Sequence, residues 1–175
     1  LVTVQAGMPM ESTVMACNRL CGSAMQAIIN VAQNIMLGDV EIGLGGGVEV
    51  MSAGGYLSPA MRSGARMGDT KMLDMMVAVL TDPFGAGHMG MTAENQAAKW
   101  GISREEQDAF ALESQQRAAR AIAEGRFKSQ IVPVTLKSRK GDVIFDTDEH
   151  PKATSLEALA KMKPAFKKEG GTVTA

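Results

Sequence analysis

Cys21 is the side chain in this sequence best suited to nucleophilic chemistry. It lies in a Cys-Gly-Ser turn between a predicted strand, Ser12–Cys17, and a predicted helix, Ser23–Leu37. The N-terminus of a helix carries partial positive charge and free N–H groups, which favour a thiolate, and Gly22 leaves room for a substrate carbonyl. The alternative is a small buried hydrophobic residue, the usual state of a free cysteine, and the pattern alone favours that alternative. Cys17, inside the strand, is interpreted as structural.

The composition limits the class of protein. With 175 residues, 45% of them hydrophobic and only 4% aromatic, the chain can form one aliphatic domain or parts of two. The 14 methionines and 19 glycines indicate close helix–sheet packing around an adaptable apolar cavity. A formal net charge of −1 argues against a nucleic-acid-binding protein, which needs a basic face.

The cysteine count and the chain ends bear on metal binding and location. Two cysteines four apart are too few for a disulfide framework, and no second pair or histidine cluster completes a zinc site, so no bound metal is expected. Free cysteines favour a reducing, cytoplasmic location. We find no run of about eighteen consecutive apolar residues, so no membrane span is expected. The start, Leu1–Val4, lacks an initiator methionine and a signal-peptide pattern, and the chain is interpreted as an internal piece of a longer protein.

The elements that would position Cys21 are the helix after it and a glycine-rich strand. The helix Ser23–Leu37 shows almost no polar face, so it is predicted to be buried on all sides and to end at Gly38. The strand Val40–Val50 contains three successive glycines, which imply that another backbone or a ligand comes very close. Glu49 in this strand is predicted to be buried and hydrogen-bonded, holding the nucleophile loop rather than acting as a base.

The remaining sequence predicts a mainly helical region with one hairpin. Its predicted elements are the helices Lys71–Leu80, Thr92–Lys99, Arg104–Glu124 and Ser155–Lys163 and the hairpin strands Gln130–Leu136 and Asp142–Asp146. The helix Arg104–Glu124 is the best marked, because Ser103 and Glu106 form a capping box and Gly125 follows. Thr154 with Glu157 is expected to cap the last helix. The inner side of the long helix is expected to hold Ala109, Phe110, Leu112, Ala118 and Ile122, with Arg117, Arg120 and Glu124 outside.

Several segments together resemble the sequence motifs of the thiolases. Asn18–Ser23 is similar to the nucleophile motif of that family, Gly45–Ser52 resembles its GGxExMS signature, and His88–Asn95 matches its HMGxTAEN segment. Further matches, in the family's order and spacing over nearly the whole chain, are Ser103–Asp108, Asp148–His150, Lys163–Phe166 and Gly171–Ala175. The resemblance is strongest to bacterial acetyl-CoA acetyltransferases and β-ketothiolases.

The resemblance implies a fold and an assembly. The fold would be α/β, a thiolase-like layered βαβ arrangement at the end of the N-terminal domain with a mainly helical loop-domain insertion. Residues 1–50 would belong to the N-terminal domain and residues 51–175 to the loop domain, where Tyr56–Gly68 would be the tetramerisation loop. The partners implied are acyl-CoA substrates and further copies of the protein in a homo-oligomer, expected to be a tetramer, with no nucleic acid and no membrane.

The resemblance also implies an activity, that of an acyl-CoA acyltransferase of fatty acid metabolism. Such an enzyme forms or cleaves 3-oxoacyl-CoA through an acyl-cysteine, here at Cys21, whose own N–H would be an oxyanion donor. Coenzyme A or acyl-CoA would be a substrate, and no cofactor would be bound permanently. The positions that face CoA by this resemblance are Leu80, His88, Met89, Lys152, Ala165 and Phe166. Without the resemblance, His88 would be an ordinary polar residue and Lys152 a solvated surface residue.

Departures from the family pattern leave alternatives open. Ala24 occupies a position that is usually glycine, and its methyl group could crowd the acyl group or the helix packing. The histidine of a GHP motif and the cysteine of a Cys-Gly-Gly-Gly motif do not occur in the chain. The alternatives are a ketoacyl synthase, a thiolase-like CoA- or lipid-binding protein without turnover, and a catalytically incomplete fragment. The Cys-Gly-Ser turn and the HMGxTAEN segment favour thiolase over ketoacyl synthase.

Overall fold

A computed structural model describes residues 2–174. The chain forms two compact units that meet in sequence between Leu80 and Thr81. The sequence-based boundary after residue 50 refers to the domains of a longer family fold, and it stays a prediction.

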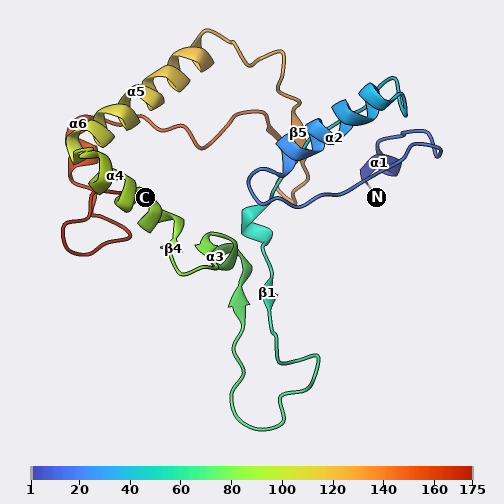
Figure 1. Cartoon of the computed structure of the whole chain (residues 1–175). Helices are drawn as coiled ribbons and strands as arrows, with labels where there is room; N and C mark the ends of the chain where they lie inside the picture. Colours follow the sequence, from blue (N-terminus) through green and yellow to red (C-terminus); the bar gives the residue numbers. More distant parts are fainter. Residues whose placement is uncertain (1, 175) are drawn as a thin grey trace. The chain divides into compact units, whose positions relative to one another are not determined.

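The first unit contains short helices and one small antiparallel sheet. Its elements are α1 (Val2–Gln5), α2 (Ser23–Leu37), the 3-10 helix η1 (Met51–Ala53), β1 (Tyr56–Leu57), β2 (Leu73–Asp74) and α3 (Met75–Val79). Strand β1 pairs with β2 with Tyr56 opposite Asp74, and residues 58–72 form the long loop between them (Figure 1). Asp74 caps α3 by accepting a hydrogen bond from the Met76 N–H at 2.9 Å, so the predicted helix 71–80 begins later than expected.

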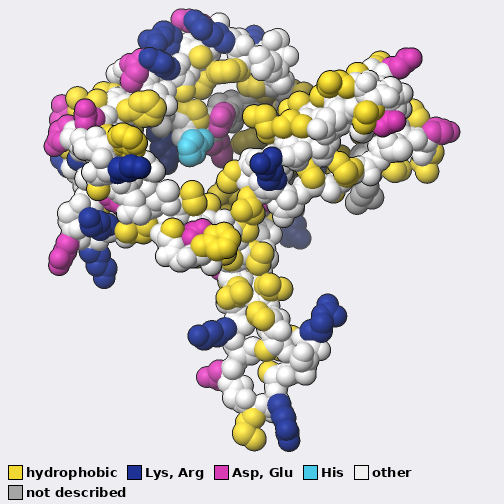
Figure 2. Space-filling model, viewed as in Figure 1, with side chains coloured by type: hydrophobic (Ala, Val, Ile, Leu, Met, Phe, Trp, Pro, Cys, Tyr) yellow, Lys and Arg dark blue, Asp and Glu magenta, His cyan; other side chains and the backbone are white. Residues whose placement is uncertain are grey.

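Helix α2 has the predicted bounds but not the predicted burial. Gly38 ends it in the left-handed conformation, with φ of 79°. None of its residues is buried within the described chain, and Figure 2 shows hydrophobic side chains along its surface. It also has a polar stripe that the sequence interpretation overlooked, because its four amides recur every three or four residues. These are Gln26, Asn30, Gln33 and Asn34, and the first two are joined by a hydrogen bond of 2.8 Å.

The segment Leu20–Leu37 is long and apolar enough to cross a membrane, judged by length and composition alone. This contradicts the expectation that no such segment exists. The evidence for a span is weak, because a core helix of a globular protein passes the same test. The amide stripe on α2 favours packing against protein, since four side-chain amides are costly in hydrocarbon.

The two predicted strands that flank α2 are not strands in the described chain. Residues 12–17 and 40–50 have no ladder partner within residues 2–174, and a strand needs a neighbour to take its backbone hydrogen bonds. The close approach predicted from the glycines is confirmed. A Cβ atom on Gly45 would come within 2.8 Å of Ile28 Cα, and one on Gly47 within 3.1 Å of Ala24 Cβ. The extended segment therefore runs directly against α2.

The second unit carries the longer helices and two hairpins. Its elements are β3 (Thr81–Asp82), β4 (Gly87–His88), α4 (Met89–Trp100), α5 (Arg104–Ala123), β5 (Val134–Leu136), β6 (Val143–Phe145) and α6 (Leu156–Ala160). The predicted hairpin is confirmed, with β5 antiparallel to β6 and Thr135 opposite Ile144. Helix α6 is shorter than predicted. Its N-cap is Ser155 rather than Thr154, because the Ser155 Oγ accepts from the Ala158 N–H at 3.2 Å.

Helix α5 is continuous, as predicted, and its capping box is confirmed. Ser103 Oγ accepts from the Glu106 N–H at 3.1 Å, and the Glu106 carboxylate accepts from the Ser103 N–H at 2.8 Å. The predicted inner side is wrong for Ala109, Phe110 and Ile122, which are exposed. Leu112 and Ala118 are half-buried, as predicted, and the fully buried residue of α5 is Asp108, so the inner face is a mixture of apolar and polar side chains.

Buried positions in the described chain are confined to α4 and α5. They are Gly90, Glu94, Ala97 and Asp108. Two of the four are carboxylates, so the interior of the second unit depends on hydrogen bonds as much as on apolar contact.

Candidate active site

The turn that carries the candidate nucleophile is held by side-chain hydrogen bonds. Leu20 has φ of 49°, and it is the one non-glycine residue with positive φ in residues 2–174. The Leu20 N–H donates to Asn18 Oδ1 at 3.0 Å, and the Leu20 carbonyl accepts from the Ser23 hydroxyl at 2.7 Å. The same hydroxyl accepts from the Arg19 N–H at 2.9 Å. A strained residue fixed from both sides is typical of a functional turn.

The two cysteines differ in exposure on either side of this turn. Cys21 is exposed and lies directly before Gly22, the N-cap of α2. Cys17 is partly covered, and its Sγ donates to the Ser23 carbonyl at 3.6 Å. A reagent or substrate therefore has access to the Cys21 thiol, while the Cys17 thiol is tied to the start of the helix.

The sequence predicted that Glu49 is buried and left open where the methyl group of Ala24 lies. Glu49 is exposed, and its carboxylate accepts from the adjacent Val50 N–H at 3.0 Å, so the predicted burial is wrong. No element within residues 2–174 covers it. The methyl of Ala24 lies against the Gly47 backbone, on the face of α2 that the glycine-rich segment contacts.

In the second unit, His88 and Phe166 form a stacked pair. Their ring centroids are 5.2 Å apart and the rings are 17° from parallel. His88 Nδ1 accepts from the Gly90 N–H at 3.0 Å, so the side chain caps α4, and the helix begins three residues earlier than predicted. With Nδ1 as acceptor, a neutral imidazole carries its proton on Nε2. Gly90 is needed here, because a Cβ at that position would overlap the Phe166 ring.

The other predicted CoA-facing residues lie in three places. Met89 is the first residue of α4 and is half exposed, and Ala165 precedes Phe166. The Lys152 N–H donates to Gln115 Oε1 of α5 at 2.9 Å, with the Lys152 side chain in solvent. Leu80 belongs to the first unit, as does Cys21. The second unit thus groups His88, Met89, Ala165 and Phe166 around the start of α4.

Glu94 is a residue in this region to which the sequence interpretation gave no role. Its carboxylate is buried and accepts from the Thr172 N–H at 2.9 and 3.0 Å, the Val173 N–H at 2.9 Å and the Thr172 hydroxyl at 3.1 Å. Burial acts to raise the pKa of Glu94, but these hydrogen bonds and the charge of Lys167 outweigh it and hold the pKa below its ordinary value. The available signal was the small residues Gly90 and Ala97, which flank Glu94 on one helix face.

A second buried polar group joins α5 to α6. Arg104 Nε donates to both oxygens of Asp108, at 2.9 and 3.0 Å. Arg104 Nη2 donates to the carbonyls of Leu159 and Met162, at 2.6 and 3.0 Å. These carbonyls lie at the C-terminal end of α6, where a helix leaves acceptor capacity open, and the Leu159 carbonyl also accepts from the Met162 N–H at 2.9 Å. Arg104 therefore fixes the short helix on the long one.

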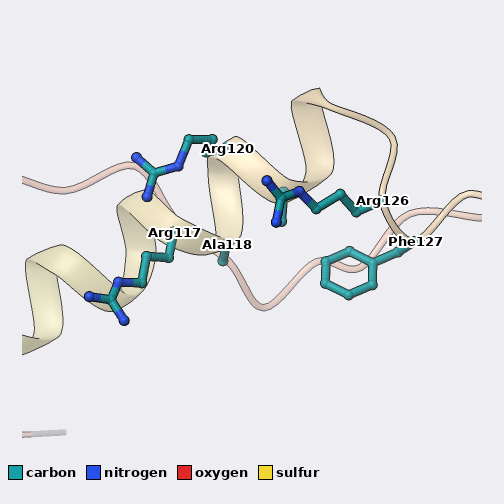
Figure 3. A pocket seen from close by; sticks show the side chains of 6 residues that line it. Arg117, Ala118, Arg120, Arg126 and Phe127 are labelled. Atoms are coloured by element: carbon teal, nitrogen blue, oxygen red, sulfur yellow. The ribbon is translucent and has the colours of Figure 1, made fainter.

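A pocket elsewhere on the second unit lies apart from the predicted CoA-facing residues. Figure 3 shows a surface pocket at the end of α5, with a volume of about 430 Å³, lined by Arg117, Ala118, Arg120, Ala121, Arg126 and Phe127. Two of its arginines pair with exposed carboxylates, Glu113 and Glu124. The pocket shares no residue with the predicted CoA-facing set. No group of three His, Cys, Asp or Glu side chains in the described part of the chain is placed to hold a metal ion.

The sequence matches a family model and many curated relatives. The model is that of the thiolase N-terminal domain, and it matches residues 1–175. The chain is 52% identical over 176 residues to the beta-ketothiolase BktB of Cupriavidus necator, covering 100% of this chain and 45% of the relative. It is 50% identical over 175 residues to an acetyl-CoA acetyltransferase of Pseudomonas aeruginosa, covering 98% and 44%.

The same relationship is found among solved structures. The acetyl-CoA acetyltransferase of Syntrophomonas wolfei matches with a TM-score of 0.93 at 49% identity, covering 99% of this chain and 44% of that one. Human mitochondrial 3-ketoacyl-CoA thiolase matches with a TM-score of 0.92 at 43% identity, covering 99% and 44%. The fold is thus the α/β fold of the thiolases, and the chain spans less than half the length of these relatives. On both the family model and the structures, the chain belongs to the thiolase family.

Proposed function

We propose that the chain is the nucleophile-bearing part of an acyl-CoA acyltransferase that forms or cleaves 3-oxoacyl-CoA. The observation that carries the proposal is the exposed Cys21 thiol, on a turn fixed by hydrogen bonds at the start of α2. The family relationship supports the same assignment, because relatives at about 50% identity are a beta-ketothiolase and acetyl-CoA acetyltransferases.

In the cleavage direction the Cys21 thiolate attacks the C3 carbonyl of a 3-oxoacyl-CoA. The C2–C3 bond then breaks, and the carbanion of the departing acyl-CoA takes up a proton, which leaves an acyl group on Cys21. The thiol of free CoA attacks this thioester, loses its proton and releases the second acyl-CoA. The Cys21 N–H is proposed as one donor to the oxygen that becomes negative.

Within the second unit, the CoA molecule is proposed to contact the residues around the start of α4, together with Lys152, and the assignment of Leu80 to CoA stays a prediction of the family resemblance. His88 with its proton on Nε2 offers a donor, and Met89 and Phe166 offer apolar surface to the pantetheine arm. The exposed Lys152 ammonium offers a cation to the phosphates. CoA and acyl-CoA act as substrates in this proposal, and no cofactor stays bound.

The complete protein is proposed to be a cytoplasmic homotetramer, with Tyr56–Gly68 in the tetramer contact. The loop between β1 and β2 supports this, because it carries exposed Met61 and Met67 side chains, and exposed apolar side chains are typical of protein contacts. The chain by itself lacks the cysteine of the Cys-Gly-Gly-Gly motif and the histidine of the GHP motif, so we expect it to be inactive without the rest of the family's length.

The competing proposal is a thiolase-like protein that binds CoA or lipid without turnover. Ala24 was its support, since a methyl group near the nucleophile could block the acyl group. That support is weakened, because the Ala24 methyl lies against the backbone of Gly47.

The test is the CoA-dependent cleavage of acetoacetyl-CoA by the full-length protein, and the reaction is monitored through the decrease in the absorbance of the acetoacetyl-CoA enolate. We expect Cys21→Ser to lower kcat about a thousandfold or more, because a hydroxyl stays protonated where a thiol ionises. Cys17→Ser is the matched control and should retain activity within about threefold. Retained activity in Cys21→Ser would remove Cys21 from the mechanism. An inactive wild-type protein that still bound CoA would support the binding-protein alternative.

A further inference from the structure

The buried carboxylate of Glu94 ties α4 to a segment near the end of the chain. Each of its two oxygens accepts more than one hydrogen bond, and all of the donors belong to Thr172 and Val173. The Thr172 hydroxyl that donates to Glu94 also accepts from Gln107 Nε2 at 2.9 Å, which adds α5 to the same network. A buried carboxylate with all its donors in place holds a single geometry, since any displacement would leave a charge unpaired.

The segment held by Glu94 leads directly to the His88–Phe166 pair. The Val173 carbonyl accepts from the Ala165 N–H at 3.0 Å, which joins the end of the chain to the residue before Phe166. A Cβ on Gly171 would overlap the Lys167 carbonyl and lie 3.1 Å from Glu94 Oε1. The backbone at Gly171 therefore passes close to both Lys167 and α4.

These contacts form a closed circuit. Gly90 and Glu94 are one helical turn apart on the buried face of α4. Gly90 receives the Phe166 ring, Glu94 receives the backbone of Val173, and Val173 returns to Ala165 beside Phe166. The position of Phe166 on His88 thus depends on a carboxylate that touches neither ring.

We propose that Glu94 is a positioning residue for acyl-CoA: it fixes the segments 164–166 and 171–174 on α4 and so sets the surface made by His88 and Phe166. This inference rests on the proposed function, because it takes that surface as part of the CoA site. Glu94 does not touch the substrate in this account. It acts by keeping the surface formed before CoA arrives, which lowers the cost of ordering on binding.

A positioning role and a purely structural role give different kinetics. If Glu94 served folding alone, its loss would reduce the amount of folded enzyme, which lowers apparent kcat and leaves KM unchanged. If it positions the CoA surface, the folded enzyme itself binds CoA less well, and KM for CoA rises.

The experiment uses the full-length protein with Glu94→Gln, which keeps the size of the side chain but places an NH2 group against backbone N–H donors. We expect KM for CoA in acetoacetyl-CoA cleavage to rise about tenfold, the effect of losing a hydrogen bond to a charged group, with a smaller change in kcat. Glu113→Gln is the matched control, because Glu113 pairs with Arg117 on the exposed side of α5. It should leave KM unchanged.

A direct readout accompanies the kinetics. Hydrogen exchange at the Ala165, Thr172 and Val173 amides should be faster in Glu94→Gln than in wild type or Glu113→Gln. Should Glu94→Gln fail to fold, Thr172→Val decides the matter. It removes the hydroxyl bonds to Glu94 and Gln107 but keeps the Thr172 N–H, and KM for CoA should then rise about threefold.

The outcomes separate this inference from the function it rests on. Raised KM for CoA with faster exchange at these amides supports the positioning role. Unchanged KM for CoA in the folded variant overturns it, whatever happens to kcat or to exchange. A wild-type protein that neither cleaves acetoacetyl-CoA nor binds CoA overturns the proposed function instead, and with it the assignment of the ligand.

Discussion

The two units of the chain differ in what holds them. In the second unit, the buried Glu94 of α4 and the partly buried Arg104 of α5 bind backbone groups far away in sequence. In the first unit, no residue from 2 to 80 is buried, and the glycine-rich segment meets α2 backbone against backbone at Gly45 and Ile28. The candidate nucleophile lies in the first unit and the candidate CoA surface in the second. The first unit leaves its apolar side chains exposed within the described chain, whereas the surface of the second unit is fixed by hydrogen bonds from buried and partly buried side chains.

The sharpest test of this difference is the removal of Arg104. Arg104→Ala leaves the largely buried Asp108 carboxylate without its guanidinium partner and takes one hydrogen bond from each of the Leu159 and Met162 carbonyls. We expect local stability of α5 and α6 to fall by about 3 kcal/mol, measured by hydrogen exchange of α6 amides in the full-length protein.

The control for that experiment lies on the same helix. Arg117→Ala breaks a solvent-exposed pair with Glu113 and should leave the stability nearly unchanged. Equal effects of the two substitutions would show that the hydrogen bonds of Arg104 do not hold α6 on α5.

The first unit is tested by adding a methyl group where backbone meets backbone. A Cβ in Gly45→Ala would lie 2.8 Å from Ile28 Cα and 2.9 Å from its nitrogen, so α2 must shift. We expect a loss of about 2 kcal/mol, seen as a lower Tm of the full-length protein.

Gly46 provides the matched position, because a Cβ there would meet nothing within 4 Å in the described chain. Gly46→Ala should leave Tm nearly unchanged unless the rest of the protein covers that side. A harmless Gly45→Ala would mean that the glycine-rich segment does not pack on α2 as described.

The smallest expected effect is a pH dependence of the second unit. The pKa of Glu94 is lowered in the folded protein, so its stabilising contribution is fully present above the ordinary value of 4.5 and is lost as pH falls through the lower folded value. As the pH is lowered from 7 through 4.5 and on through the lower folded value, exchange at the Thr172 and Val173 amides, corrected for its intrinsic pH dependence, should lose protection in wild type. The same series on Glu94→Gln should show a smaller loss. Glu113 and Glu157, which also have lowered pKa values, remain in both proteins and cancel in the comparison.

Sequence reasoning predicted local features well because local rules govern them. The bounds of α2, the capping box of α5 and the β5–β6 hairpin depend on residues within a few positions of each other. The motif segments identified the family, and the glycine run predicted the contact with α2.

Burial was predicted poorly because it depends on atoms distant in sequence. Glu49 and the apolar side of α2 are exposed within this chain, and the predicted strands 12–17 and 40–50 find no partner in it. On α5, apolar periodicity pointed to Phe110, whereas the inner face follows Asp108 and its bond to Arg104. Glu94 was missed for a related reason, since its partners lie 78 and 79 residues away.

The most direct test of the central claim is the chemical identity of the covalent intermediate. The full-length protein is mixed with acetoacetyl-CoA, quenched in acid and digested, and the peptides that contain Cys17 and Cys21 are sequenced by mass spectrometry. A matched sample of Cys21→Ser serves as control. The account predicts an acetyl group on Cys21, none on Cys17, and none in the control. An acetyl group on Cys17, or substrate turnover with no acetylated cysteine, would contradict the assignment of Cys21 as the nucleophile.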